Sequence, residues 1–172
     1  MITSNIGKIF LDAYNKEYGT SYDARTFFLE QFYPLFFDQN KYMMTAGNSP
    51  LENPKLSWDD MIKGKKPFET PEQRKIRFEK LIKKIEESEA DASIARGYAS
   101  LDVAATTSGQ VTDLKLPNSQ EEIYASWIGD ALGIGVQGGF SILFSNKEIL
   151  LDIFKGWKLY RKCLNETSML KG

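Results

Sequence analysis

The chain has 172 residues, of which 42% are apolar and 26% are charged, so it can bury one core and belongs to neither a disordered nor a fibrous class. Its 22 Lys and Arg residues nearly balance its 23 Asp and Glu residues, and a net charge of −1 excludes a global field that attracts nucleic acid or membrane. Histidine is absent, which excludes histidine-dependent triads and histidine metal sites, and the single cysteine, Cys163, excludes an internal disulfide.

These features predict a cytoplasmic protein that does not enter a membrane. A chain without disulfides suits a reducing compartment. The first residues lack the basic and continuous apolar stretches of a signal peptide. The one stretch of membrane-spanning length, residues 127–144, is interrupted by Asp130, Gln137 and five glycines.

The amino-terminal part of the chain predicts two aromatic-rich helices. Apolar residues recur at helical spacing over residues 3–18, and Gly19 supplies a typical helix end. A second helix is expected to begin at Asp23 and to bend or break at Pro34. Half of the aromatic residues lie within the first 42 positions, and this density is typical of a buried core.

Residues 38–56 are rich in Asn, Gly and Pro without any periodicity, and they predict an irregular surface loop. A short helix is expected over residues 57–64. The segment Thr70-Pro-Glu-Gln is a capping box with proline at the first helical position, and it predicts a helix from there to about residue 90. The buried stripe of this helix is expected to comprise Phe78, Leu81, Ile82 and Ile85.

The second half of the chain mixes strand and helix signals. Residues 101–107 and 111–116 flank a Ser-Gly-Gln turn and predict a β-hairpin. Capping boxes that begin at Ser119 and Ser145 predict two further helices, of which the last ends near Cys163. Between these helices lie a glycine segment, residues 133–139, and an apolar stretch, residues 140–144, that reads as a buried strand or a connector.

The predicted fold is therefore α+β and predominantly helical, with five or six helices around a short β-hairpin or small sheet, and an all-α fold is the runner-up. One domain is expected over residues 1–172. The polar residues after Leu164 show no closing element, which leaves open that the chain is a piece or subunit of a larger assembly.

Two motifs suggest specific chemistry. The glycines at 133, 135 and 138 match the spacing of a dinucleotide-binding loop, but the flanking elements read as helix before and strand after, so glycine-mediated packing or a hinge is the preferred interpretation. The predicted hairpin places Asp102 on one strand and the pair Asp113 and Lys115 on the other. In nucleases of the restriction-endonuclease type, two such carboxylates hold Mg²⁺ and the lysine helps to activate water; a solvated strand face is the simpler interpretation.

A third feature is a basic segment between Lys63 and Glu86, which contains nine basic and four acidic residues. Cations along a helix and the loop before it can follow a phosphate backbone, although a solvated helix face with an ion pair between Glu79 and Lys83 also accounts for them. The residues expected to contact nucleic acid are Lys65, Lys66, Arg74, Arg77, Lys80 and Lys84.

No constellation in the sequence is specific enough to establish an enzyme. The favoured hypothesis is a non-enzymatic binding or assembly module without a cofactor, part of a nucleic-acid-handling complex through its basic helix. One alternative is a Mg²⁺-dependent nuclease that uses Asp102, Asp113 and Lys115, with the two aspartates as metal ligands. Another is a homo-oligomeric structural protein. The expected partners are a second protein or a second copy of the chain, together with nucleic acid.

Overall fold

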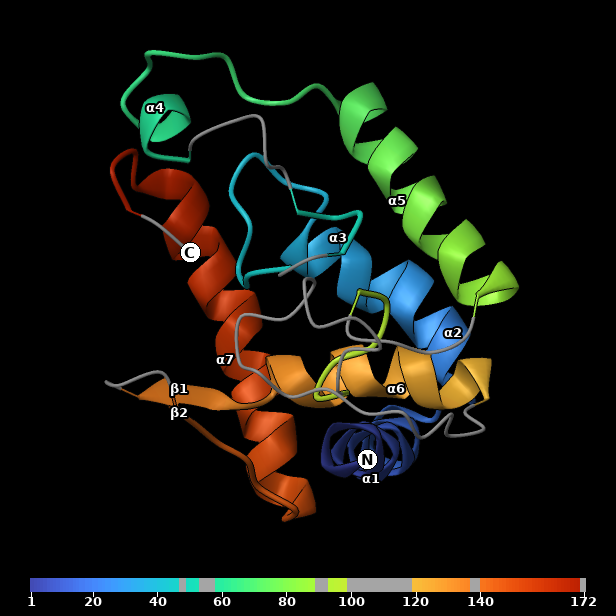
Figure 1. Ribbon diagram of the computed structural model, residues 1–172. Helices are drawn as coiled ribbons and strands as arrows, with labels where there is room; N and C mark the ends of the chain where they lie inside the picture. Colours follow the sequence, from blue (N-terminus) through green and yellow to red (C-terminus); the bar gives the residue numbers. More distant parts are fainter. Residues whose placement is uncertain (47–48, 53–57, 89–92, 99–118, 137–139, 171–172) are drawn as a thin grey trace.

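The computed structural model describes residues 1–46, 49–52, 58–88, 93–98, 119–136 and 140–170, and within them the protein is a predominantly helical α+β fold with one small antiparallel sheet (Figure 1). The described elements are α1 (Ile2–Tyr18), α2 (Ala24–Phe27), the π-helical turn η1 (Phe28–Phe32), α3 (Tyr33–Phe36), α4 (Trp58–Ile62), α5 (Pro71–Glu87), α6 (Gln120–Ala131), β1 (Ile134–Val136), β2 (Phe140–Ile142) and α7 (Lys147–Glu166). Since α2, η1 and α3 form one continuous bent helix, the described helices number six, which confirms the predicted fold class.

The first two predicted helices form as their local signals indicate. Gly19 ends α1 in the left-handed conformation with φ 63°, which glycine adopts without steric cost. Asp23 caps α2 by accepting a hydrogen bond from the backbone N–H of Thr26. The predicted disturbance at Pro34 takes the form of a wide π turn just before it, because the proline ring has no room beside the carbonyl of Glu30 in a regular α-helix.

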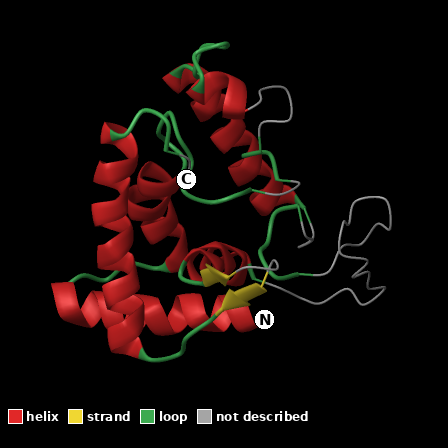
Figure 2. Cartoon of the chain, turned by 90° about the vertical axis from the view of Figure 1, so that its left-hand side faces the viewer, coloured by secondary structure: helices red, strands yellow, loops and turns green. Residues whose placement is uncertain are grey.

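The core is organised around α6, which contacts α1 and the α2–α3 helix and lies between them in Figure 1; Figure 2 shows the same helices turned by 90°. Eight of the twelve residues of α6 are buried, including Tyr124 and Trp127. The aromatic residues of the amino-terminal helices pack around it, with the rings of Phe28 and Tyr124 at a centroid distance of 5.3 Å. The aromatic density in the first 42 positions therefore builds the core, as expected.

Two glycines allow α1 and α6 to approach closely. A Cβ atom at Gly7 would lie 2.0 Å from the carbonyl oxygen of Ala125, and a Cβ atom at Gly129 would lie 1.9 Å from the carbonyl oxygen of Thr3. No side chain fits at such distances, so the two backbones are in direct contact at this crossing.

The predicted surface loop at residues 38–56 has a different role. Its described parts contain no helix or strand, but they are not confined to the surface. Tyr42, Met43, Ala46 and Leu51 are buried and join the hydrophobic core. This segment therefore contributes to packing, and the surface assignment was wrong because polar and turn-forming residues outnumber its apolar anchors.

Three capping boxes were expected, and only one is complete. Thr70 and Gln73 exchange both hydrogen bonds at the start of α5. Ser119 caps α6, but the carboxylate of Glu122 pairs with Lys8 at 3.1 Å and does not return a hydrogen bond to Ser119. The last helix begins one residue later than predicted, because Asn146 and not Ser145 accepts the hydrogen bond from Ile149, and it extends beyond Cys163 to Glu166.

The small sheet lies at the edge of the molecule, after the carboxyl end of α6 (Figure 1). Its register places Ile134 opposite Ile142 and Val136 opposite Phe140. Residues 140–144 were interpreted as a buried strand or a connector. A strand forms over Phe140–Ile142, but the predicted burial is wrong, because Ile142 is 48% exposed. The hairpin predicted over residues 101–116 lies outside the described residues. Among the described helices, none is both long and apolar enough to cross a membrane.

Candidate functional site

The start of α5 carries a charged network that joins this helix to the segment after α3. Arg74 is 91% buried and donates from Nε to Asp38 at 2.9 Å. Its Nη1 donates to the carbonyl of Glu69 at 2.8 Å and to Asn40 at 3.4 Å. Arg74 lies on the buried face of α5, one turn before the start of the apolar stripe, which explains why its charge points inward.

Arg77 extends this network on the next turn of the helix. Its Nη1 donates to the carbonyl of Leu51 at 2.7 Å, and its Nη2 pairs with the carboxylate of Glu69. The guanidinium also lies over the ring of Tyr42, 5.5 Å from its centroid. Burial lowers the pKa of Arg77, while the nearby Tyr33 opposes this shift. Both predicted nucleic-acid-binding arginines are thus engaged with the protein itself.

The predicted lysines behave differently, since Lys65, Lys66, Lys80 and Lys84 are all exposed. Lys66 pairs with Asp60 at 3.4 Å, and Lys84 donates to the hydroxyl of Ser93 at 3.0 Å. Within the part of the chain that the structure describes, the ammonium groups of Lys65 and Lys80 have no hydrogen-bond or acidic partner.

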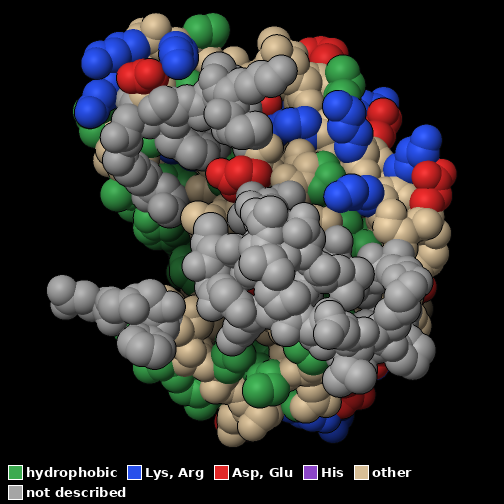
Figure 3. Space-filling view, viewed as in Figure 1, with side chains coloured by type: hydrophobic (Ala, Val, Ile, Leu, Met, Phe, Trp, Pro, Cys, Tyr) green, Lys and Arg blue, Asp and Glu red, His purple; other side chains and the backbone are tan. Residues whose placement is uncertain are grey.

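The basic segment does not form one continuous positive stripe. Figure 3 shows one group of Lys and Arg side chains at the upper left, in the region of α4, and another along α5, where acidic side chains alternate with them. On α5 the described ion pairs join Lys75 to Glu79 at 3.9 Å and Lys83 to Glu87 at 4.0 Å, and the expected pair of Glu79 with Lys83 does not form among them.

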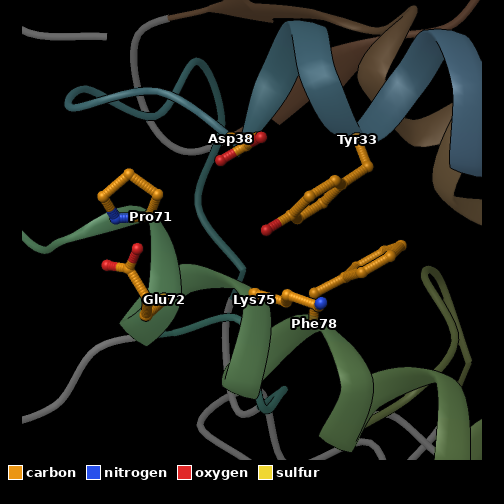
Figure 4. A pocket seen from close by; sticks show the side chains of 6 residues that line it. All are labelled: Tyr33, Asp38, Pro71, Glu72, Lys75 and Phe78. Carbon is orange, nitrogen blue, oxygen red and sulfur yellow. The ribbon is translucent and has the colours of Figure 1, made fainter.

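A first cavity of about 370 Å³ opens between α3 and the first turns of α5 (Figure 4). Its wall includes Tyr33, whose ring stacks on Phe78 with centroids 3.7 Å apart. The Tyr33 hydroxyl points into the space between Asp38 and α5, as Figure 4 shows. Burial and the charge of Asp38 raise the pKa of Tyr33 to about 12, so this phenol stays protonated at neutral pH and does not act as a base.

A second cavity, of about 460 Å³, lies on the other side of Asp38, where the segment after α3 meets α4, the start of α5 and the end of α7. Two buried cations, Lys41 and Arg74, form part of its wall. The polar side chains of Asn165 and Ser168 contribute another part, and apolar groups from α4 and Phe68 complete it.

Lys41 and Arg161, which are both buried, hold the walls of this second cavity in place. Lys41 donates to the carbonyls of Leu164 and Thr167 at the carboxyl end of α7. Arg161 of α7 donates in return to the carbonyls of Leu35, Phe36 and Lys41. Helix carboxyl ends favour cations, so the two side chains link α7 and α3 reciprocally. Burial lowers the pKa of Arg161 to about 10, which leaves it charged at neutral pH.

Sequence patterns gave no indication of Lys41, Arg161 or Asp38 as site residues. Their partners lie up to 126 positions away along the chain, and most are backbone carbonyls, which carry no sequence signal.

The residues of the nuclease hypothesis, Asp102, Asp113 and Lys115, lie outside the described residues. Among the residues that are described, no group of three or more Asp, Glu or Cys side chains is arranged to hold a metal ion. Of the glycine motif, Gly133 and Gly135 fall after α6 and within β1, whereas a dinucleotide-binding loop precedes its helix.

Comparisons of the chain with protein-family models, with curated proteins and with solved structures found no match.

Proposed function

We propose that this protein is a non-enzymatic binding module that holds nucleic acid through the exposed lysines of the loop after α4 and of α5. One observation carries the proposal: Lys63, Lys65 and Lys80 are exposed and have no acidic partner among the described residues. A lysine that is not neutralised locally is available to a phosphate, and its binding releases the counterions of the nucleic acid.

The inward arginines support a particular mode of recognition. Arginine reads guanine through paired hydrogen bonds, whereas lysine contacts phosphate as a flexible point charge. Because Arg74 and Arg77 are held by Asp38 and Glu69, the contacts that remain are to the phosphate backbone. The module is therefore expected to bind with little sequence preference and with a strong dependence on salt.

A salt titration tests this function. The affinity for a labelled oligonucleotide is measured by fluorescence anisotropy at increasing NaCl concentrations, for the wild type and for the variant K80Q/K84Q. Each lost phosphate contact lowers the steepness of log K against log [salt] by about 0.9 for duplex DNA, so the double variant should give a visibly shallower slope.

The matched control is K155Q/K162Q, which removes the same charge from exposed positions on α7. It should leave the slope close to that of the wild type. Absence of binding at low salt, or an equal effect of the two double variants, would contradict the proposed function.

A second candidate function is homo-oligomeric assembly, and the sheet favours it. Ile134, Val136 and Ile142 are between 40% and 48% exposed, and the register places Ile134 directly opposite Ile142. Two-stranded sheets are marginally stable in water, and no third strand pairs with this one among the described residues. This hypothesis predicts a solution mass above the 19.6 kDa of one chain.

A further inference from the structure

The second cavity, between α4, the start of α5 and the end of α7, has an unusual charge distribution. Two cations line it, Arg74 and Lys41, and they are 9% and 7% exposed. Among the described residues, the one acidic side chain that lines it is Asp38, which already accepts a hydrogen bond from Arg74. The cavity wall therefore carries a net positive charge, although the chain as a whole carries −1.

Lys41 differs from most buried lysines in its partners. Its ammonium group donates to the carbonyls of Leu164 and Thr167, which are neutral acceptors. These carbonyls lie at the carboxyl end of α7, whose partial negative charge offsets only part of a full positive charge. No acidic side chain pairs with Lys41 among the described residues.

Both cations also keep unused hydrogen-bond donors. An ammonium group has three N–H bonds, and Lys41 uses two of them. Arg74 bonds through Nε and Nη1, and its Nη2 has no partner among the described residues. Both side chains line the cavity, so their remaining N–H groups are suited to an acceptor that enters it.

The rest of the wall limits the shape of such an acceptor. Met61, Ile62 and Phe68 form an apolar side, while Asn40, Asn165 and Ser168 form a polar one. A volume of about 460 Å³ falls within the range of small-molecule sites. We propose that this cavity binds a small amphipathic anion, with its phosphate or carboxylate group near Arg74 and Lys41 and its apolar body against Met61, Ile62 and Phe68.

Isothermal titration calorimetry with three probes tests the ligand class. Phenyl phosphate and hexanoate represent the two oxyanions, and 1-hexanol represents an apolar body without charge. Binding of either anion with no binding of hexanol is the expected result, and the preferred anion identifies the head group. If neither anion binds at millimolar concentration, or if hexanol binds as well as the anions, the proposal is overturned.

A matched pair of variants at the rim tests the location. Ser168 is exposed and follows the last helix, so S168D and S168N are both compatible with the fold. S168D places a carboxylate at the cavity and should weaken binding of the anion roughly tenfold or more, because like charges repel at this short range. S168N keeps a similar size without the charge and should bind as the wild type does. Equal affinities of the two variants would overturn the site.

This inference is independent of the proposed nucleic-acid function. The variant K80Q/K84Q changes neither Arg74 nor Lys41, so it should bind the preferred anion with wild-type affinity. A loss of anion binding in that variant would contradict the cavity assignment and would place the anion on the surface of α5.

Discussion

Three buried cations, Lys41, Arg74 and Arg161, show how single residues fix the walls of the cavities. Each donates to groups that come from another part of the chain, and most of the acceptors are backbone carbonyls. A buried charge is tolerated when such acceptors replace its water. The same side chains that appear as surface charge in the sequence therefore act as structural links.

The raised pKa of Tyr33 predicts how the stability of the protein depends on pH. Its pKa is raised from 10 to about 12, so the folded state holds the phenolic proton more tightly than the unfolded state does. This contribution to the free energy of unfolding is fully present below about pH 10 and is lost as the pH rises through about 12. We expect the wild type to lose stability relative to Y33F across this window in urea titrations, because Y33F has no phenol to titrate at this position. A difference that stays constant over the same window would show that burial does not perturb this phenol.

At the scale of elements, helix ends follow local chemistry and helix contacts do not. Thr70, Ser119 and Asp23 cap their helices through atoms only three residues away, which a sequence pattern can reveal. The crossing of α1 and α6 depends on Gly7 and Gly129, which lie 122 positions apart and show no pattern in the sequence.

Alanine substitutions of three helical glycines separate the effect of helix propensity on stability from the effect of close packing. In an open helix, Gly→Ala stabilises by about 0.5 to 1 kcal/mol, and G156A should do so because nothing lies within 4 Å of an added Cβ. G7A and G129A should instead destabilise by about 3 kcal/mol, because their Cβ atoms would overlap a backbone carbonyl. Urea-induced unfolding measures all three. A gain in stability for G7A or G129A would refute the close crossing of α1 and α6.

The start of α7 offers a second test between neighbouring residues. The structure assigns the cap to Asn146, whose side chain accepts from the N–H of Ile149 at 3.0 Å. N146A should therefore cost about 1 kcal/mol of stability, whereas S145A should cost little. Thermal unfolding followed by circular dichroism distinguishes the two variants. The reverse order would restore the capping box that the sequence suggested at Ser145.

For the whole molecule, the exposed sheet and the nearly neutral net charge set the expected associations. A chain with a net charge of −1 is not kept apart from its copies by strong self-repulsion. The described strands also contain no charged residue that would discourage edge-to-edge pairing. Association through this sheet is consistent with both features.

Sedimentation equilibrium tests assembly through the sheet. If the chain assembles this way, the wild type should have a mass above 19.6 kDa, and the variant I134T/I142T should return to that of one chain, because threonine keeps the strand propensity but removes apolar surface. The control L159Q changes a residue of α7 that is 67% exposed, and it should leave the mass unchanged. A monomeric wild type would rule out the oligomeric alternative.

Local contacts and apolar periodicity were enough to predict the helical fold class, the carboxyl end of α1, the start of α5 and the concentration of aromatic residues in the core. The tertiary structure was needed to show that Arg74 and Arg77 face inward while Lys65 and Lys80 stay exposed. It also decided that residues 38–46 supply core side chains and that two buried cations line one cavity. The physical reason is common to these cases: the environment of a charge depends on carbonyls and carboxylates brought from distant positions, and their approach is not encoded in local spacing.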